Sequence, residues 1–288
     1  MTGNIAGLFD GLFDGLFDDA AIFPPGDAPM TLAVPAHREL RSRLGGLVGP
    51  FVVPAARLDQ LLAELDDGEE FPISLIAAAA DLPAAVDRVA TGHRLHLTAV
   101  EVPVVADAAA AEQAVRVLTD VLPTGVPAAV ELPRTGTRDD VLDVLAASSG
   151  HRAKLRTGGL RAELFPSPAE LVDTLLACLT RQVPFTCTAG LHHAVRHTDP
   201  VTGLAHHGFL NVLVTVDGLA AGAPPLLALD RLREDDGTAL ATAVRTWSTD
   251  RVARARGSFT SFGTCSVLEP VDDLVGLGLL PSSERIPA

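Results

Sequence analysis

The residues best suited to catalytic chemistry follow short apolar runs, at positions where β-strands are expected to end. They are Glu101, Glu131, Lys154, Arg156, Thr188, His192, His193 and Cys265. Carboxylates, an amine, imidazoles and a thiol carry acid–base and nucleophilic catalysis in enzymes. If the strands are parallel, their carboxyl ends lie on the same side of the sheet. The spacing therefore predicts one pocket that collects these side chains.

Lys154 is the most informative of them, because it is the only lysine among 22 basic residues. Lys154 and Arg156 stand two residues apart, so they share one face of a strand, which we expect to be the interior of a barrel. Burial and a neighbouring cation would lower the pKa of the Lys154 amine and make it a nucleophile for carbonyl groups. Two alternatives stay open: the two cations bind an anionic group, or they form ion pairs with Glu101 and Glu131.

Five of the nine histidines lie between His192 and His207. We expect His192 or His207 to act as a general acid or base, since imidazole titrates near neutral pH. His193 and His197 could share a metal ion if they lie on one helix, but the usual zinc-ligand pattern is absent. We therefore predict neither a bound metal ion nor another cofactor. A metal-dependent hydrolase or isomerase built on His192, His193 and His207 is the alternative.

The elements that must position these side chains alternate between short apolar runs and longer helical patterns. The expected strands are 51–54, 73–77, 95–101, 128–132, 153–156, 185–188 and 262–266, with an eighth near 238–242. The expected helices are 58–65, 82–90, 108–122, 137–147, 167–181 and 209–219. This alternation predicts βαβ units and an α/β fold, with a (β/α)8 TIM-type barrel or a barrel variant as the leading architecture. An open doubly wound sheet is the alternative, although no GxGxxG motif follows a strand.

The pattern of the first fifty residues predicts a helical segment, which we expect to pack on a barrel formed by residues 51–288. The tetrapeptide Gly-Leu-Phe-Asp occurs three times from Gly7 to Asp18, so its Leu and Phe side chains recur every four residues, as on one face of a helix. A second helix is expected over 30–44. No linker divides the chain, and the polar stretch 196–203 is expected to be an active-site or surface loop. We therefore expect a single structural domain.

The composition excludes several classes of protein. Of 288 residues, 48% are hydrophobic and 20% are charged, which is typical of a globular protein rather than a disordered chain. The net charge of −14 disfavours nucleic acid as a partner. The three cysteines form no disulfide or zinc pattern, and Cys178 and Cys187 are expected to be structural. No apolar run is long enough to span a membrane, and no basic signal peptide is present, so we expect a cytoplasmic protein. A homo-oligomer is compatible with the sequence, which does not define the oligomeric state.

Several motifs together resemble a family of uncharacterised bacterial hypothetical proteins. They are DDAAIFPP at 18–25, KLRTGG at 154–159, TAGLHH at 188–193, HGFLN at 207–211 and FGTCS at 262–266. The resemblance covers nearly the whole chain and implies a shared fold, but it supplies no reaction. In addition, Lys154 followed by Thr157 and Gly158 is locally similar to the Schiff-base strand of deoxyribose-phosphate-type class I aldolases.

These observations predict an enzyme that acts on a small anionic metabolite containing a carbonyl group. It would be a lyase or an aldolase, with Lys154 as amine nucleophile or as stabiliser of an enolate. The expected catalytic residues are Lys154, His192, His207 and Glu131, and the expected substrate-binding residues are Arg156, Arg196, Asn211, Glu101, Thr188 and Cys265. Arg156 and Arg196 would bind the anionic group. A ligand-binding barrel without catalysis is a third alternative, because a fold alone does not imply a function.

Overall fold

Eight parallel strands close into a barrel in the computed structural model, which describes residues 11–92, 94–134 and 136–281. The strands are β1 (Phe17–Asp19), β2 (Val48–Pro54), β3 (Phe71–Ile76), β4 (Leu95–Val102), β5 (Ala128–Glu131), β6 (His151–Arg156), β7 (Phe185–Thr188) and β10 (Phe259–Thr264). Each strand pairs with the next along the chain, and β10 pairs with β1 to complete the ring. The protein therefore has a TIM-barrel-like α/β fold.

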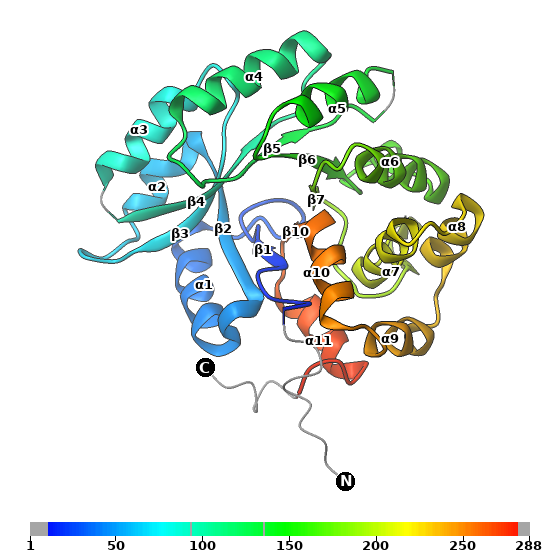
Figure 1. Ribbon diagram of the computed structural model, residues 1–288. Helices are drawn as coiled ribbons and strands as arrows, with labels where there is room; N and C mark the ends of the chain where they lie inside the picture. Colours follow the sequence, from blue (N-terminus) through cyan, green and yellow to red (C-terminus); the bar gives the residue numbers. More distant parts are fainter. Residues whose placement is uncertain (1–10, 93, 135, 282–288) are drawn as a thin grey trace.

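Helices surround the strands and cover the outside of the barrel (Figure 1). They are α1 (Met30–Leu44), α2 (Leu58–Leu62), α3 (Leu82–Gly92), α4 (Ala108–Val121), α5 (Arg138–Ala147), α6 (Pro168–Thr180), α7 (Phe209–Ala220), α8 (Pro225–Arg233), α9 (Gly237–Arg245), α10 (Thr249–Ser258) and α11 (Leu268–Gly276). Between β7 and β10 the chain forms α7 to α10 and a small antiparallel hairpin of β8 (His197–Thr198) and β9 (Ala205–His206). The predicted polar loop at 196–203 thus includes one arm of this hairpin.

The seven main predicted strands and the predicted helices from residue 30 onward are present, with bounds that differ by a few residues. The eighth strand expected near 238–242 is wrong, because these residues lie in α9. Leu240, Ala241 and Val244 are its buried residues, a helical spacing, and the side chain of Asp236 caps its N-terminus by accepting a hydrogen bond from the backbone of Thr238.

The prediction of a helix over the Gly-Leu-Phe-Asp repeat is also wrong for the described residues, which begin at Gly11. Gly11 and Gly15 have φ angles of 85° and 56°, a left-handed conformation that suits turns and not an α-helix. The chain then enters β1, whose residues are all buried. Strand β1 and helix α1 are therefore the first β/α unit of the barrel, and the first fifty residues are not a helical segment packed on a barrel that starts at residue 51.

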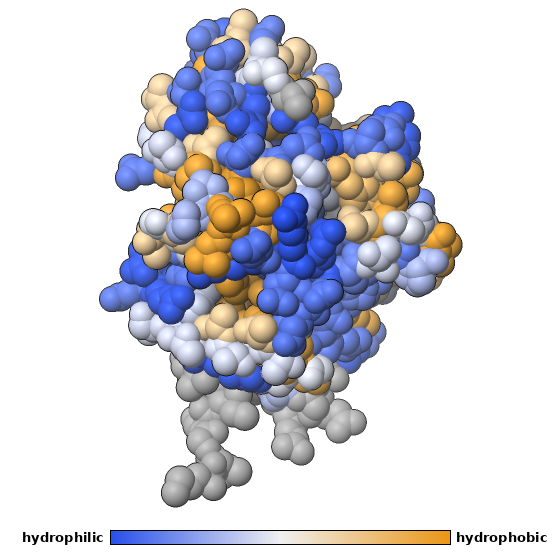
Figure 2. All heavy atoms as spheres, turned by 90° about the vertical axis from the view of Figure 1, so that its right-hand side faces the viewer, coloured by the Kyte–Doolittle hydropathy of each residue, from blue (hydrophilic) through white to orange (hydrophobic). Residues whose placement is uncertain are grey.

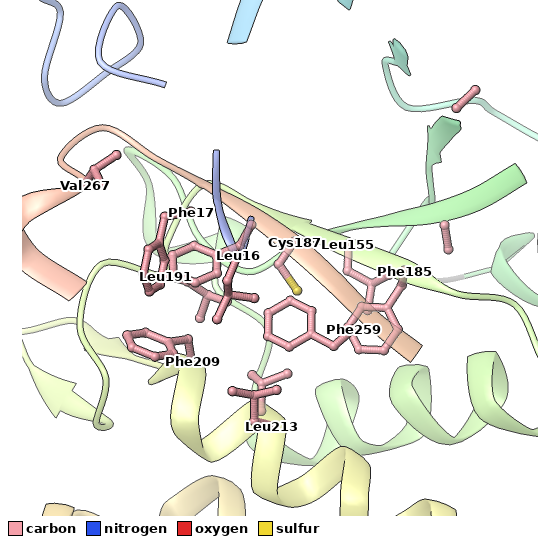
Figure 3. Packing of buried hydrophobic residues seen from close by; sticks show 14 of the residues in the cluster. Leu16, Phe17, Leu155, Phe185, Cys187, Leu191, Phe209, Leu213, Phe259 and Val267 are labelled. Atoms are coloured by element: carbon pink, nitrogen blue, oxygen red, sulfur yellow. The ribbon is translucent and has the colours of Figure 1, made fainter. Parts of the chain in front are cut away.

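An apolar layer between the strands and the helices forms the core (Figure 3). The rings of Phe185 and Phe259, from neighbouring strands, stack with their centroids 5.2 Å apart. Phe17 meets Phe209 of α7 edge to face at 5.6 Å, which fixes that helix against β1. The face of the molecule that carries the right-hand helices of Figure 1 is mainly polar, with apolar patches between (Figure 2). No helix in the described ranges is long and apolar enough to cross a membrane.

Candidate active site

A cavity of about 660 Å³ opens at the carboxyl ends of the barrel strands. This is the end of a parallel barrel at which enzymes of this fold place their reacting groups. Most of the predicted site residues line the cavity: Glu101, Glu131, Lys154, Arg156, Thr188, His192 and Cys265. The expectation of one shared pocket therefore holds for these residues.

Lys154 lies at the centre of a charged cluster on the cavity wall. Its Nζ atom is 2.6 Å from Oε2 of Glu101 and 3.6 Å from Oε2 of Glu131, and the residue is only 4% exposed. Arg156 donates a hydrogen bond of 2.9 Å from Nε to Oε1 of Glu131. Ser74 on β3 donates one of 2.8 Å from its hydroxyl to Oε1 of Glu101. Two cations and two carboxylates thus compensate each other inside the barrel.

This cluster determines the charge of Lys154. Burial alone would lower the pKa of Lys154, but Glu101 and Glu131 outweigh that effect, so the pKa is raised above its usual value. The expected lowering by burial and by Arg156 is therefore wrong, because the two carboxylates outweigh both effects and Arg156 is itself paired with Glu131. Lys154 is an ammonium ion at neutral pH.

His192 lies on another side of the same cavity and is held through one ring nitrogen. Its Nδ1 atom is 3.2 Å from Oε2 of Glu269, 3.4 Å from the hydroxyl of Thr264 and 3.7 Å from Sγ of Cys265. Burial acts to lower the pKa of His192, but Cys265 and Glu269 together raise it to about 9. The ring is therefore an imidazolium at neutral pH and a proton donor, rather than a base.

Three predicted site residues do not reach the main cavity. His207 is buried, and its Nε2 donates a hydrogen bond of 2.8 Å to the carbonyl of Pro166, while burial lowers its pKa. Asn211 lies inside α7, where every residue from Phe209 to Leu219 is buried, and accepts a hydrogen bond from the backbone of Arg196. Arg196 lines a different hollow, next to Asp273. These residues lie apart because the hairpin and α7 carry the chain away from the end of β7.

The other histidines of the segment 192–207 do not form a metal site. His193 and His197 are neighbours, with ring centroids 4.6 Å apart, but they lie on a loop and on β8 rather than on one helix. His193 is tied instead to Asp273, whose Oδ2 is 3.1 Å from Nδ1. In the described ranges, no three His, Cys, Asp or Glu side chains are grouped so that they could hold a metal ion. The geometry thus gives no support to a centre made of His192, His193 and His207.

Other charged residues near the site were not identified from the sequence. Asp18 on β1 is buried inside the barrel, where it lines a small cavity with Glu101 and Arg152. Burial raises the pKa of Asp18 to about 8, against the opposing effects of Ser261 and Arg152. Asp18 ends the Gly-Leu-Phe-Asp repeat, so the helical interpretation of that repeat concealed it. Glu269 is not predicted as a site residue because the sequence analysis expects no helix at the position of α11. Arg161 is not predicted because it lies in the loop after β6.

The closed parallel barrel, with a cavity lined by charged and apolar side chains, defines a TIM-barrel-like α/β protein, a fold that is common among enzymes. No model of a known protein family matches the sequence, and no curated protein matches it either. The likeness of its motifs to uncharacterised bacterial proteins therefore stays a prediction, and the function must be argued from the site itself.

Proposed function

We propose that this protein is an enzyme that acts on an anionic metabolite containing a carbonyl group, by a lyase-like or aldolase-like reaction. One observation supports it most directly: the Lys154 ammonium is held 2.6 Å from Glu101 and 3.6 Å from Glu131 in the wall of the cavity. An ammonium fixed in a buried site can stabilise negative charge that develops on a carbonyl oxygen. A carbonyl compound that loses a proton from the carbon next to the carbonyl, while its oxygen is stabilised in this way, becomes an enolate.

The charge of Lys154 favours enolate stabilisation over Schiff-base formation. A Schiff base requires the neutral amine as nucleophile, whereas two carboxylates keep Lys154 protonated. A carbonyl oxygen of the substrate that accepts a hydrogen bond from Nζ would replace one of the two carboxylates as a partner of the ammonium. The negative charge that develops on this oxygen would then be stabilised by an ammonium that is already in position. We therefore place Lys154 in the role of electrostatic stabiliser.

Glu131 is the group we propose as base. Its contact with Lys154 is the longer of the two, 3.6 Å against 2.6 Å for Glu101, and its other partner is the partly exposed Arg156. A carboxylate beside the carbonyl can remove the proton from the carbon next to it. His192, an imidazolium on another side of the cavity, can return a proton to the product.

The anionic part of the substrate would meet two arginines. Arg156 keeps about a third of its side chain exposed, at 32%, although it is paired with Glu131. Arg161 is 69% exposed, pairs with the similarly exposed Glu163 and lines the same cavity. Apolar side chains make up much of the remaining lining, so they would contact the carbon skeleton: Phe23, Val52, Ile76, Leu160 and Leu164.

Proton exchange in heavy water tests the proposal. A panel of 2-keto acids and sugar phosphates is incubated with the protein in D₂O, and NMR follows the loss of the proton next to the carbonyl. We expect exchange with at least one compound. Lys154→Met should lower the exchange rate about 10²–10³-fold, since one preorganised donor of this kind contributes that much to catalysis. Arg88→Met, at an exposed position on α3 that does not line the cavity, is the matched control and should exchange at the wild-type rate.

Borohydride treatment with the same panel separates the two roles of the lysine. Since Lys154 is the only lysine, intact mass analysis followed by one peptide map assigns any reduced adduct either to Lys154 or to the chain terminus. Exchange without an adduct on Lys154 supports enolate stabilisation. A stable adduct on Lys154 would instead show that Lys154 reacts by the Schiff-base mechanism. Binding of compounds from the panel without any proton exchange would indicate a ligand-binding protein without catalysis.

A further inference from the structure

We propose that Cys265 is a second reactive group of the cavity: a nucleophile, activated by His192, that adds reversibly to the carbonyl carbon of an aldehyde. The inference narrows the carbonyl substrate class to aldehydes and so rests on the proposed function, but the thiol chemistry can be tested without it. The protein would then hold one carbonyl compound between two groups, an ammonium on β6 and a thiol after β10.

The position of Cys265 distinguishes it from the other cysteines. It follows β10 directly, is partly exposed, and lines both the main cavity and an adjoining cavity of about 420 Å³. Cys178 and Cys187 are buried in the core at 0% and 1% exposure, and burial raises the pKa of Cys178 to about 12 and that of Cys187 well above its usual value. A thiol that stays protonated and inaccessible is inert, so Cys265 is placed to react and Cys187 is not, although Cys187 also borders the main cavity.

The neighbours of Cys265 suit the activation of a thiol. Nδ1 of His192 lies 3.7 Å from Sγ, within hydrogen-bond reach for sulfur, and Glu269 lies 3.2 Å from the same nitrogen. The imidazolium proton on this nitrogen is therefore stabilised by the carboxylate, and the imidazolium in turn stabilises a thiolate on Sγ. Nucleophilic cysteines in enzymes have this arrangement of thiol, base and a third group that orients the base.

The proposed step is complete in atoms and electrons. In the reacting form the sulfur is a thiolate beside the His192 imidazolium; the sulfur forms a bond to the aldehyde carbon, and the π electrons of the carbonyl move to its oxygen. That oxygen then takes the proton from Nδ1, which yields a neutral hemithioacetal and a neutral imidazole. No leaving group, oxidant or reductant is required, and reversal of the same transfers releases the aldehyde.

The two cavities indicate the shape of the ligand. Both are lined by Gly159, Leu160, His192 and Cys265, so the thiol lies where they meet. Together they exceed the space that a three-carbon acid needs, since drug-sized ligands occupy pockets of about 300–1,000 Å³. An aldehyde with a longer carbon chain can thus bond to Cys265 and extend into the second cavity, past Leu204 and Phe165.

Alkylation of the native protein tests the activation. Iodoacetamide is added at pH 7 and intact mass spectrometry follows the modification over time. We expect one alkylated cysteine, lost in Cys265→Ser and retained in Cys187→Ser. His192→Asn should slow the alkylation at least tenfold, and Glu269→Gln should slow it by less, because it leaves the imidazole in place. Thermal unfolding of each variant shows that it is folded under the assay conditions.

The addition itself is tested with a ¹³C-labelled aldehyde, [1-¹³C]butanal, whose labelled carbon changes from trigonal to tetrahedral when sulfur adds. We expect a new tetrahedral carbon signal with the wild type and with Lys154→Arg, and none with Cys265→Ser. Alkylation that is equally fast in His192→Asn, or the absence of the new signal with the wild type, would overturn the proposal. If Cys265 reacts in this way but no compound exchanges protons, the proposed function fails and the thiol site stands.

Discussion

At the scale of single residues, the site is governed by how charges are paired inside the barrel. Lys154 and Arg156 would each be costly to bury alone, and each has a carboxylate at less than 3 Å. The breaking of such a pair costs about 3–5 kcal/mol, because it leaves an uncompensated charge. The cluster therefore serves stability and chemistry together, and a variant that keeps the cation, Lys154→Arg, disturbs the fold less than Lys154→Met.

His192 offers a direct test of this electrostatic account. NMR titration of its ring should give a midpoint near pH 9, and Glu269→Gln should move that midpoint toward lower pH by removing a carboxylate. Because the folded-state pKa lies above the ordinary value of 6.5, the stability that His192 contributes is present below pH 6.5 and is lost as the pH rises through 9. The pH dependence of urea unfolding measures that loss. His207, which contacts Pro166 and not Glu269, is the internal control; an unchanged His192 midpoint in Glu269→Gln would contradict the account.

The sequence predicted where these side chains meet but not how they are charged. Side chains alternate along strands, and parallel strands end on one side, so Glu101, Glu131 and Lys154 could be placed in one pocket from their spacing alone. The sign of the pKa change of Lys154 depends on distances to two carboxylates that lie on other strands. Spacing within one strand carries no information about those distances.

At the scale of elements, α6 shows how local sequence fixes a boundary near the site. Ser167 accepts a hydrogen bond from the backbone of Glu170, and the Glu170 side chain accepts one from the backbone of Ser167, which completes a capping box. Pro168 occupies the first turn. This start was predictable, because all of the residues that form it lie within four positions of one another.

Ser167→Ala should therefore lower the free energy of unfolding by about 1 kcal/mol, the usual contribution of an N-cap side chain. Urea denaturation monitored by circular dichroism measures the change. Ser149→Ala, at an exposed position in the turn before β6, is the matched control and should stay within about 0.5 kcal/mol of the wild type. Equal effects of the two substitutions would mean that the capping box contributes nothing measurable.

Strand β1 was not predicted, because the residues that make it a strand are distant from it in sequence. It has only three residues, all buried, and it follows turns whose four-residue spacing imitates a helical repeat. Periodicity needs a longer window to separate a strand from a helix. What makes Phe17–Asp19 a strand is its pairing with β2 and β10, which are distant in sequence.

At the scale of the whole molecule, Asp18 links the stability of the barrel to pH. Its folded-state pKa of about 8 lies above the ordinary value of 3.8 for an aspartate, so the folded state holds a proton that the unfolded chain releases. The contribution of Asp18 to stability is thus fully present below pH 3.8 and is lost as the pH rises toward 8.

Asp18→Asn, which cannot ionise, should escape that loss. Relative to the wild type, the variant should gain about 2–4 kcal/mol of unfolding free energy between pH 5 and pH 9, at roughly 1.4 kcal/mol for each unit of a pKa difference. Urea unfolding at the two pH values measures the gain. Asp250→Asn, on the exposed side of α10, serves as control and should follow the wild-type curve. A constant difference between Asp18→Asn and the wild type across this range would show that Asp18 is ionised in the folded protein.

The pairing of β1 with β10 also affects how the chain can be made. Phe17 lies opposite Phe262, so the ring cannot close until the last strand has been synthesised and has left the ribosome. Until then β1 and β7 each present an open edge, and open edges recruit other strands. The growing chain must therefore protect these edges during translation, whether by its own helices or by a chaperone, for longer than a protein whose first strands pair only with each other.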